Sequence, residues 1–164
     1  MKFPYLASAL LLAAMSSNAA AAEEMKCPLS GAYDPSNPFA RIIEGEGRQA
    51  IVYSGPLVIA FVPIGWDNPG HVLIVPKRHV RNLDDVSDAE MLAVFHLIKR
   101  IAVAQERAFG STGFSIEQNN ARHQSVCHAH FHVIPNTPKQ PVEKATPAQM
   151  EAIAAKLRAA LPQP

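Results

Sequence analysis

The chain has 164 residues, of which 48% are hydrophobic and 18% are charged, and its formal net charge is +1 at pH 7. This length predicts one domain with a short appendage and argues against two independent hydrophobic cores. The balanced charge, without a basic stripe, argues against a nucleic-acid-binding face, so we expect no nucleic-acid partner.

Residues 1–22 have the pattern of a secretory signal peptide. Lys2 supplies a positive charge, residues 7–15 form a short apolar run, and residues 20–22 offer small side chains for cleavage before Glu23. The apolar run is shorter than the about 20 residues that a membrane-spanning helix needs. We therefore expect an exported bacterial protein, periplasmic or secreted, that has no membrane span after the signal is removed.

Export affects how the two cysteines, Cys27 and Cys127, are interpreted. In an oxidising compartment they can form one disulfide, which would stabilise the fold by closing a long loop. The sequence does not show that they approach each other, so two separate buried thiols remain the alternative.

Residues 23–36 are rich in Pro, Gly, Ser and Asn and predict an irregular lead-in, followed by a folded domain over residues 37–164. Asn37 can cap a short helix that has Pro38 at its first position and stops at Gly45. Strands are expected over residues 50–53, 57–62 and 71–75, and the Gly and Pro turns between them favour an antiparallel meander.

A long helix follows the third predicted strand. Ser87 and Glu90 form a capping box at its start, and the helix runs to Phe109 and Gly110. Two more strands over residues 114–118 and 127–134 and a final helix over residues 146–161 complete an α+β domain with a five-stranded, mainly antiparallel sheet. We expect the residues of the long helix that pack into the core to be Leu92, Phe95, Ile98 and Ala102, with His96 beside them in a structural or surface position.

Three of the seven histidines, His128, His130 and His132, stand at alternate positions of the last predicted strand and would share one of its faces. They can be polar residues without a further role, or metal ligands together with His71 or His79. They can also act in nucleophilic catalysis, because a neutral imidazole held by one ring nitrogen attacks phosphorus or acyl centres with the other. The triplet alone does not decide among these.

The segment His-Ala-His-Phe-His-Val-Ile at residues 128–134 resembles the signature of the histidine triad (HIT) superfamily, in which three histidines alternate with apolar residues. Gln-Ser-Val at 124–126, the segment from Pro-Gly-His to Pro-Lys-Arg-His at 69–79, and the helix at 39–45 also resemble that family. The similarity covers roughly residues 37–161. It implies a HIT-like fold, commonly paired as a homodimer, with no cofactor and no obligatory metal.

The resemblance also implies a nucleotide hydrolase or nucleotidyl transferase that acts on the α-phosphate of a nucleoside phosphoramidate or phosphoanhydride. His130 would attack phosphorus and form a nucleotidyl-histidine intermediate, while His128 would orient His130, with His71 lying behind as its partner. His132 would contact the phosphate oxygens. The matching positions imply further substrate contacts at Ser125, Gln124 and Asn119 (or Glu117). They also imply an apolar wall that packs against the base, formed by Phe39, Ile42, Phe61 and Ile64. Such apolar residues equally form the core of an ordinary α+β domain.

The sequence departs from the family at Pro63, which stands where relatives carry an Asp or Asn that binds the ribose hydroxyls. Proline has no side-chain acceptor, so that contact should be absent unless Asp67 or Asn68 replaces it. The loop before the triad lacks the usual glycines, and Arg122 and His123 in it are either additional phosphate donors or solvated residues.

Some bacterial relatives hold a structural zinc ion through two N-terminal cysteines. Asn37 and Ala40 occupy those positions here, so no metal site is expected. Two alternatives to the hydrolase remain, namely a non-catalytic protein of the periplasm that binds nucleotide or phosphate, and a metal site on the histidines.

Overall fold

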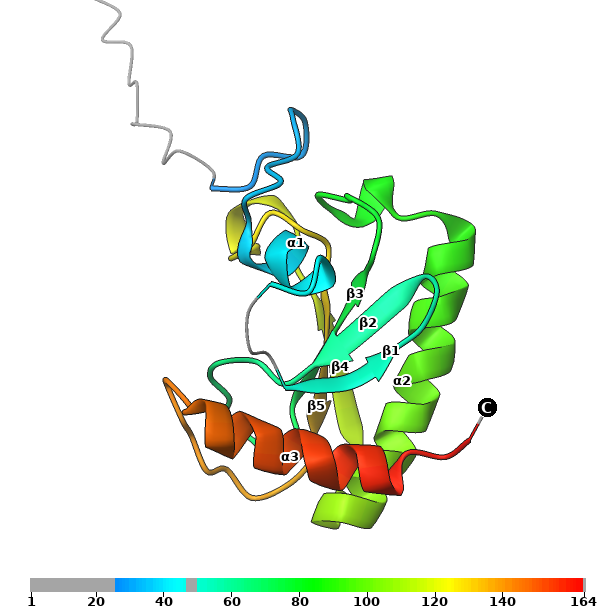
Figure 1. Ribbon diagram of the computed structural model, residues 1–164, viewed down its shortest axis with the longest axis vertical. Coiled ribbons are helices and arrows are strands. Elements are labelled where there is room, and N and C mark those ends of the chain that lie inside the picture. Colours follow the sequence, from blue (N-terminus) through cyan, green and yellow to red (C-terminus); the bar gives the residue numbers. More distant parts are fainter. Residues whose placement is uncertain (1–25, 47–49, 164) are drawn as a thin grey trace, which may run out of the picture.

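The computed structural model describes residues 26–46 and 50–163 (Figure 1). The predicted signal peptide therefore lies outside the described residues. Within these ranges no helix is long and apolar enough to cross a membrane. The elements are α1 (Pro38–Ile43), β1 (Ile51–Ser54), β2 (Val58–Phe61), β3 (Val72–Pro76), α2 (Asp88–Phe109), β4 (Phe114–Gln118), β5 (Phe131–Pro135) and α3 (Pro147–Ala160), with short 3-10 turns at Leu83–Asp85 and Ala121–His123.

The five strands form one sheet in the order β1-β2-β3-β5-β4, and all neighbours are antiparallel. The meander of β1, β2 and β3 and the α+β fold class are confirmed. The first four strands lie within one residue of their predicted limits. The last was predicted to begin at Cys127 and instead begins at Phe131.

One face of the sheet is covered by α2 and α3 (Figure 1), which form the main core with alternate residues of the strands. Both helices begin with the capping boxes predicted from the sequence, at Ser87 and Thr146. Gln105 of α2 is fully buried, and its Nε2 donates to the backbone oxygens of Gly70 and Val133, both at 3.0 Å. It thus ties α2 to the turn before His71 and to the strand that carries His132.

The predicted core stripe of α2 is wrong for two of its members. Leu92 is 58% exposed and Phe95 is 45% exposed, whereas Ile98 is buried and Ala102 half-buried. The helix is apolar on more than one side, and the packing of the sheet selects one of them. The residues of α2 that are buried are Glu90, Val94, Leu97, Ile98, Ile101, Ala104 and Gln105.

The opposite face of the sheet carries α1 and a smaller apolar cluster of Phe39, Ile59, Phe61, Leu73 and Val75. Side chains alternate between the faces of a strand, so Phe131 and Val133 join the main core while His132 projects to the α1 side. The second face therefore carries the candidate site.

The N-terminal lead-in lies beside α1 (Figure 1), and Cys27 near its start forms a disulfide with Cys127, with the two Cα atoms 5.1 Å apart. Of the two alternatives for the cysteines, the structure has the bridge. The bond joins residues 100 positions apart. A loop of that size stabilises the native state by about 4 to 5 kcal/mol in the chain-entropy model.

Candidate functional site

The triad begins before the strand that was expected to carry all of it. The backbone N–H of Ala129 donates to the Val80 oxygen at 2.9 Å, and the ladder between β3 and β5 begins only at Phe131. The predicted strand over residues 127–134 is therefore wrong in its first four residues. His128 and His130 lie on an irregular segment, and this lets each ring find a backbone partner.

His128 is fully buried between two hydrogen-bond partners. Its Nε2 lies 2.8 Å from the backbone oxygen of Pro76, and its Nδ1 lies 2.6 Å from the hydroxyl of Tyr33. Burial lowers the pKa of His128 to about 4, so the ring is neutral near pH 7. Because a carbonyl only accepts, Nε2 carries the proton, and Nδ1 accepts from the Tyr33 O–H.

His130 is held in a defined tautomer by its neighbour. Its Nδ1 lies 2.7 Å from the backbone oxygen of His128, which requires a proton on Nδ1. Burial lowers the pKa of His130 below its usual value, so the ring stays neutral near pH 7 and Nε2 keeps a lone pair. The Phe39 ring meets His130 edge-on, with 5.1 Å between ring centroids. This is the arrangement that a nucleophilic imidazole needs.

His71 contacts His132, whereas the resemblance placed His71 behind as the partner of His128. The Nε2 of His71 lies 3.0 Å from the Nδ1 of His132, and burial lowers the pKa of each ring to about 4. One neutral ring therefore donates to the other. The His132 ring also lies beside His130, at 5.1 Å between centroids, so His132 connects His71 to the His130 ring.

The turn that delivers His71 requires a glycine. Gly70 has a φ of +95°, and a Cβ there would meet the Phe109 ring at 2.9 Å. Both the left-handed backbone and the close approach of Phe109 exclude a larger residue.

A cavity of about 260 Å³ opens beside the triad. All four residues of the predicted apolar wall, Phe39, Ile42, Phe61 and Ile64, line it, as does Pro63. The acidic residue at its rim is Glu46, whereas the side chain of Asn68 donates to the Thr137 backbone oxygen elsewhere. The structure thus brings the predicted wall together, and neither Asp67 nor Asn68 is among the lining residues.

The residues in and near the loop before the triad that were predicted to contact substrate differ in their burial and in their hydrogen bonds. Gln124 is buried, and its Nε2 donates to the backbone oxygens of Arg81 and Val126 at 2.5 and 2.9 Å, which holds the loop in place. Ser125 is exposed. Asn119 is half-buried just beyond β4. Glu117 is the residue that pairs directly with His132 across the strands, so these two share a face.

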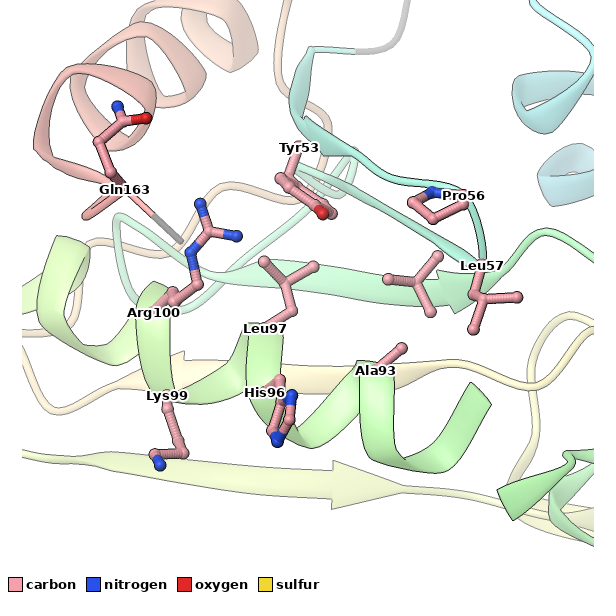
Figure 2. A pocket seen from close by; sticks show the side chains of 10 residues that line it. Tyr53, Pro56, Leu57, Ala93, His96, Leu97, Lys99, Arg100 and Gln163 are labelled. Atoms are coloured by element: carbon pink, nitrogen blue, oxygen red, sulfur yellow. The ribbon is translucent and has the colours of Figure 1, made fainter. Parts of the chain in front are cut away.

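A larger cavity, of about 560 Å³, is elsewhere (Figure 2). It lies between the β1–β2 hairpin and α2, and Leu97 and Val58 of the main core line it, which places it on the sheet face away from the histidines. The guanidinium of Arg100 lies over the Tyr53 ring and donates to the Pro162 oxygen at 3.1 and 2.9 Å. His71 and the three triad histidines are not among the residues that line this cavity.

Two side chains at positions considered for a metal site, His128 and Asn37, are engaged in other contacts. Both ring nitrogens of His128 have hydrogen-bond partners, and Asn37, at a zinc-ligand position of some relatives, caps α1 through Oδ1. Over residues 26–46 and 50–163, no group of three or more His, Cys, Asp or Glu has an arrangement that could hold a metal ion.

Two members of the site were not predicted from the sequence. Tyr33 comes from the lead-in, where no periodic pattern marks it, and Pro76 contributes a backbone oxygen, which no side-chain motif shows. Only the disulfide pairing of Cys27 would have drawn attention to that segment.

A known family model matches most of the described domain. The model of the HIT domain matches residues 44–157. A HIT-like protein of Methanocaldococcus jannaschii is 38% identical over 99 residues, which are 59% of this chain and 76% of that protein. The purine nucleoside phosphoramidase of Escherichia coli K12 is 33% identical over 107 residues, which are 63% of this chain and 90% of that enzyme.

A solved structure agrees with the same assignment. The crystal structure of a HIT-like protein from Bartonella henselae, described as involved in cell-cycle regulation and as holding an unknown ligand, superposes with a TM-score of 0.74 at 37% identity. The match covers 80% of this chain and all of that one. With the family model spanning residues 44–157 and the fold in agreement, this chain belongs to the HIT domain family.

Proposed function

We propose that this protein is a nucleotide hydrolase or nucleotidyl transferase that acts on the α-phosphate of a nucleoside phosphoramidate or phosphoanhydride. The observation that carries the proposal is the hydrogen bond from Nδ1–H of His130 to the His128 oxygen, which leaves the Nε2 lone pair free. The name of the related purine nucleoside phosphoramidase supports this class of substrate.

In the first step, Nε2 of His130 attacks the α-phosphorus, and the bond from phosphorus to the leaving nitrogen or oxygen breaks. The leaving group departs with that electron pair and takes up a proton from water. The His130 ring becomes positively charged, so its hydrogen bond to the His128 oxygen strengthens as charge develops. Water, or another acceptor in a transferase, then attacks phosphorus and loses its proton to solvent, and the N–P bond breaks with its electron pair returning to Nε2 of neutral His130.

The test is turnover by the mature protein of adenosine phosphoramidates and dinucleoside polyphosphates. His130→Ala should abolish turnover, and His96→Ala, at an exposed site on α2, is the matched control. An acid-labile nucleotidyl mass increment that is present in wild type and absent in His130→Ala supports the covalent route. Equal turnover by wild type and His130→Ala would refute the role of His130.

Pro63 favours a second candidate, a protein that binds nucleotide or phosphate without turnover. It lines the cavity where an acidic or amide side chain is expected, and it offers no side-chain acceptor to a ribose. This candidate predicts that nucleotides raise the melting temperature of wild type while no product forms, and the substrate panel above separates the two.

We propose that the protein is exported to the periplasm or secreted. The disulfide supports this location, because such bonds persist in oxidising compartments. Cell fractionation, together with a mature N-terminus near residue 23, tests it. Retention of the intact N-terminus in the cytosol would contradict it.

A homodimer is proposed as the working state. Phe114 and Ile116 on β4 are 44% and 40% exposed, and Ile116 pairs with Val133, so both lie on the sheet face that α2 covers elsewhere. Phe114 and Ala102 of α2 line a common cavity. The edge strand and the exposed apolar side of α2 thus offer a surface for a second copy of the chain.

A further inference from the structure

The lead-in is fastened at two places, to the residue before the triad and to the segment that follows β3. The disulfide joins Cys27 to Cys127, the residue immediately before His128. The side chain of Asn82 donates to the Leu29 oxygen at 2.8 Å, and the guanidinium of Arg81 donates to the Gly31 oxygen. Residues 27–31 are thus held against Cys127 and against Arg81 and Asn82, although no regular element contains them.

These contacts of the lead-in place the side chain of Tyr33. Its ring stacks on His79, with 4.5 Å between centroids and 11° between planes, and its hydroxyl reaches Nδ1 of His128 at 2.6 Å. Burial raises the pKa of Tyr33, so the phenol keeps its proton and donates it. The Tyr33 side chain therefore occupies the space between two histidines from different parts of the chain.

Two hydrogen bonds, one to the ring and one to the backbone oxygen of His128, link Tyr33 to His130 through the His128 residue. The Tyr33 O–H donates to Nδ1 of His128, and Nε2–H of His128 donates to the Pro76 oxygen. The backbone oxygen of His128 accepts from Nδ1–H of His130. The direction of the His128 backbone oxygen depends on the orientation of the whole His128 residue. A group that fixes the His128 ring therefore also helps to fix the Nδ1–H tautomer and the ring orientation of His130.

We propose that Tyr33 is a positioning residue for the transfer reaction that acts through His128, and that the Cys27–Cys127 disulfide keeps it in place. This inference rests on the proposed function of His130. It makes the rate of transfer sensitive to a dithiol reductant. Such a dithiol gives two electrons and two protons to the bridge, the S–S bond breaks into two thiols, and the dithiol itself becomes a disulfide. The half-buried Cys127 is the more accessible sulfur, since Cys27 is 3% exposed.

The first test is Tyr33→Phe, which keeps the ring stacked on His79 and removes only the O–H donor. We expect kcat to fall about 10-fold with little change in KM, because the substrate contacts remain and the nucleophile is less well directed. Tyr53→Phe removes a phenol on the other side of the sheet and is the matched control. A wild-type kcat in Tyr33→Phe would overturn the inference.

The second test follows the protonation of His128 by ¹⁵N NMR of the imidazole nitrogens, which does not depend on turnover. Donation from Tyr33 favours the neutral ring, so Tyr33→Phe should raise the pKa of His128. The other titratable groups that act on this ring, His79, His130 and Glu90, are the same in both proteins. Identical His128 titration in wild type and Tyr33→Phe would overturn the inference.

The third test is a double-mutant cycle of Tyr33→Phe with Cys27→Ser. If the bridge acts by placing Tyr33, the double variant should lose no more activity than Tyr33→Phe alone, and dithiothreitol should lower kcat of wild type but leave Cys27→Ser unchanged. Additive losses would overturn the role of the bridge. If wild type turns over no substrate, the proposed function fails, and the NMR titration alone decides the placement of Tyr33.

Discussion

Nε2 of His71 and Nδ1 of His132 lie 3.0 Å apart, on rings that are both neutral near pH 7. Together with His128 they make three buried or half-buried histidines whose pKa is lowered to about 4 by burial. Such rings take up protons far more readily in the unfolded chain. The free energy of unfolding must therefore depend on pH in the range where the unfolded chain binds them.

The first prediction concerns this stability. Burying these histidines in their neutral form contributes to the free energy of unfolding, and this contribution is fully present above pH 6.5 and is lost as the pH falls from 6.5 to about 4. For one independent histidine, the difference between the pKa of the folded and of the unfolded chain corresponds to about 3 kcal/mol in the free energy of unfolding. Urea unfolding at pH 7.5 and 5 should show the decrease, and His71→Gln should make the decrease smaller. The exposed-site variant His96→Gln is the control, and equal stability at the two pH values would contradict the prediction.

The second prediction concerns the pH dependence of catalysis. His130 must be neutral to attack, and burial lowers its pKa. The acid limb of kcat/KM should therefore have its midpoint below 6.5, the ordinary value for histidine. Initial rates with an adenosine phosphoramidate from pH 4 to 8 measure it. A midpoint at or above 6.5 would show that the buried, neutral state described here is not the reactive one.

The third prediction concerns Pro63, which lines the cavity of the apolar wall. Because proline has no side-chain acceptor, the protein should discriminate little between ribonucleotide and 2′-deoxyribonucleotide substrates. Pro63→Asp should raise the preference for the ribonucleotide about 10-fold in kcat/KM, the value of roughly one charged hydrogen bond. Pro63→Ala removes the ring without adding an acceptor and should leave the ratio unchanged. If the preference for the ribonucleotide rises equally in Pro63→Asp and Pro63→Ala, the change results from the loss of proline and not from the added acceptor.

A fourth prediction follows from Ala121, a non-glycine residue with a φ of +51° in the loop before the triad. The left-handed conformation costs an L-residue about 1 kcal/mol, which glycine does not incur. Ala121→Gly should thus stabilise the protein by up to about 1 kcal/mol in urea unfolding. Ala129→Gly, which removes a fully buried methyl group, should destabilise it. A loss of stability in Ala121→Gly would contradict the assigned backbone conformation.

The fifth prediction tests the homodimer. Phe114→Glu places a charge on the exposed part of the edge strand and should convert a dimer to a monomer in light scattering coupled to size exclusion. Leu29→Glu changes an equally exposed apolar residue of the lead-in and should leave the dimer intact. A wild-type protein that is monomeric at micromolar concentration would contradict the proposal.

Much of the fold could be predicted from local signals. Asn37, Ser87 and Thr146 each cap the helix that the sequence assigned to them, because a cap depends on residues within one turn. Which side of α2 is buried could not be predicted in the same way. Leu92 and Ile98 are equally apolar, and only the position of the sheet separates the exposed residue from the buried one.

The sequence by itself determined the α+β class and the family, and it singled out the alternating histidines and Pro63 as candidate site positions. Tertiary structure alone decided that Cys27 meets Cys127, that Tyr33 and the Pro76 oxygen hold His128, and that His71 pairs with His132. The reason is physical. Capping and strand alternation act over a few residues, whereas these partners lie 52 to 100 positions apart and are brought together only by packing.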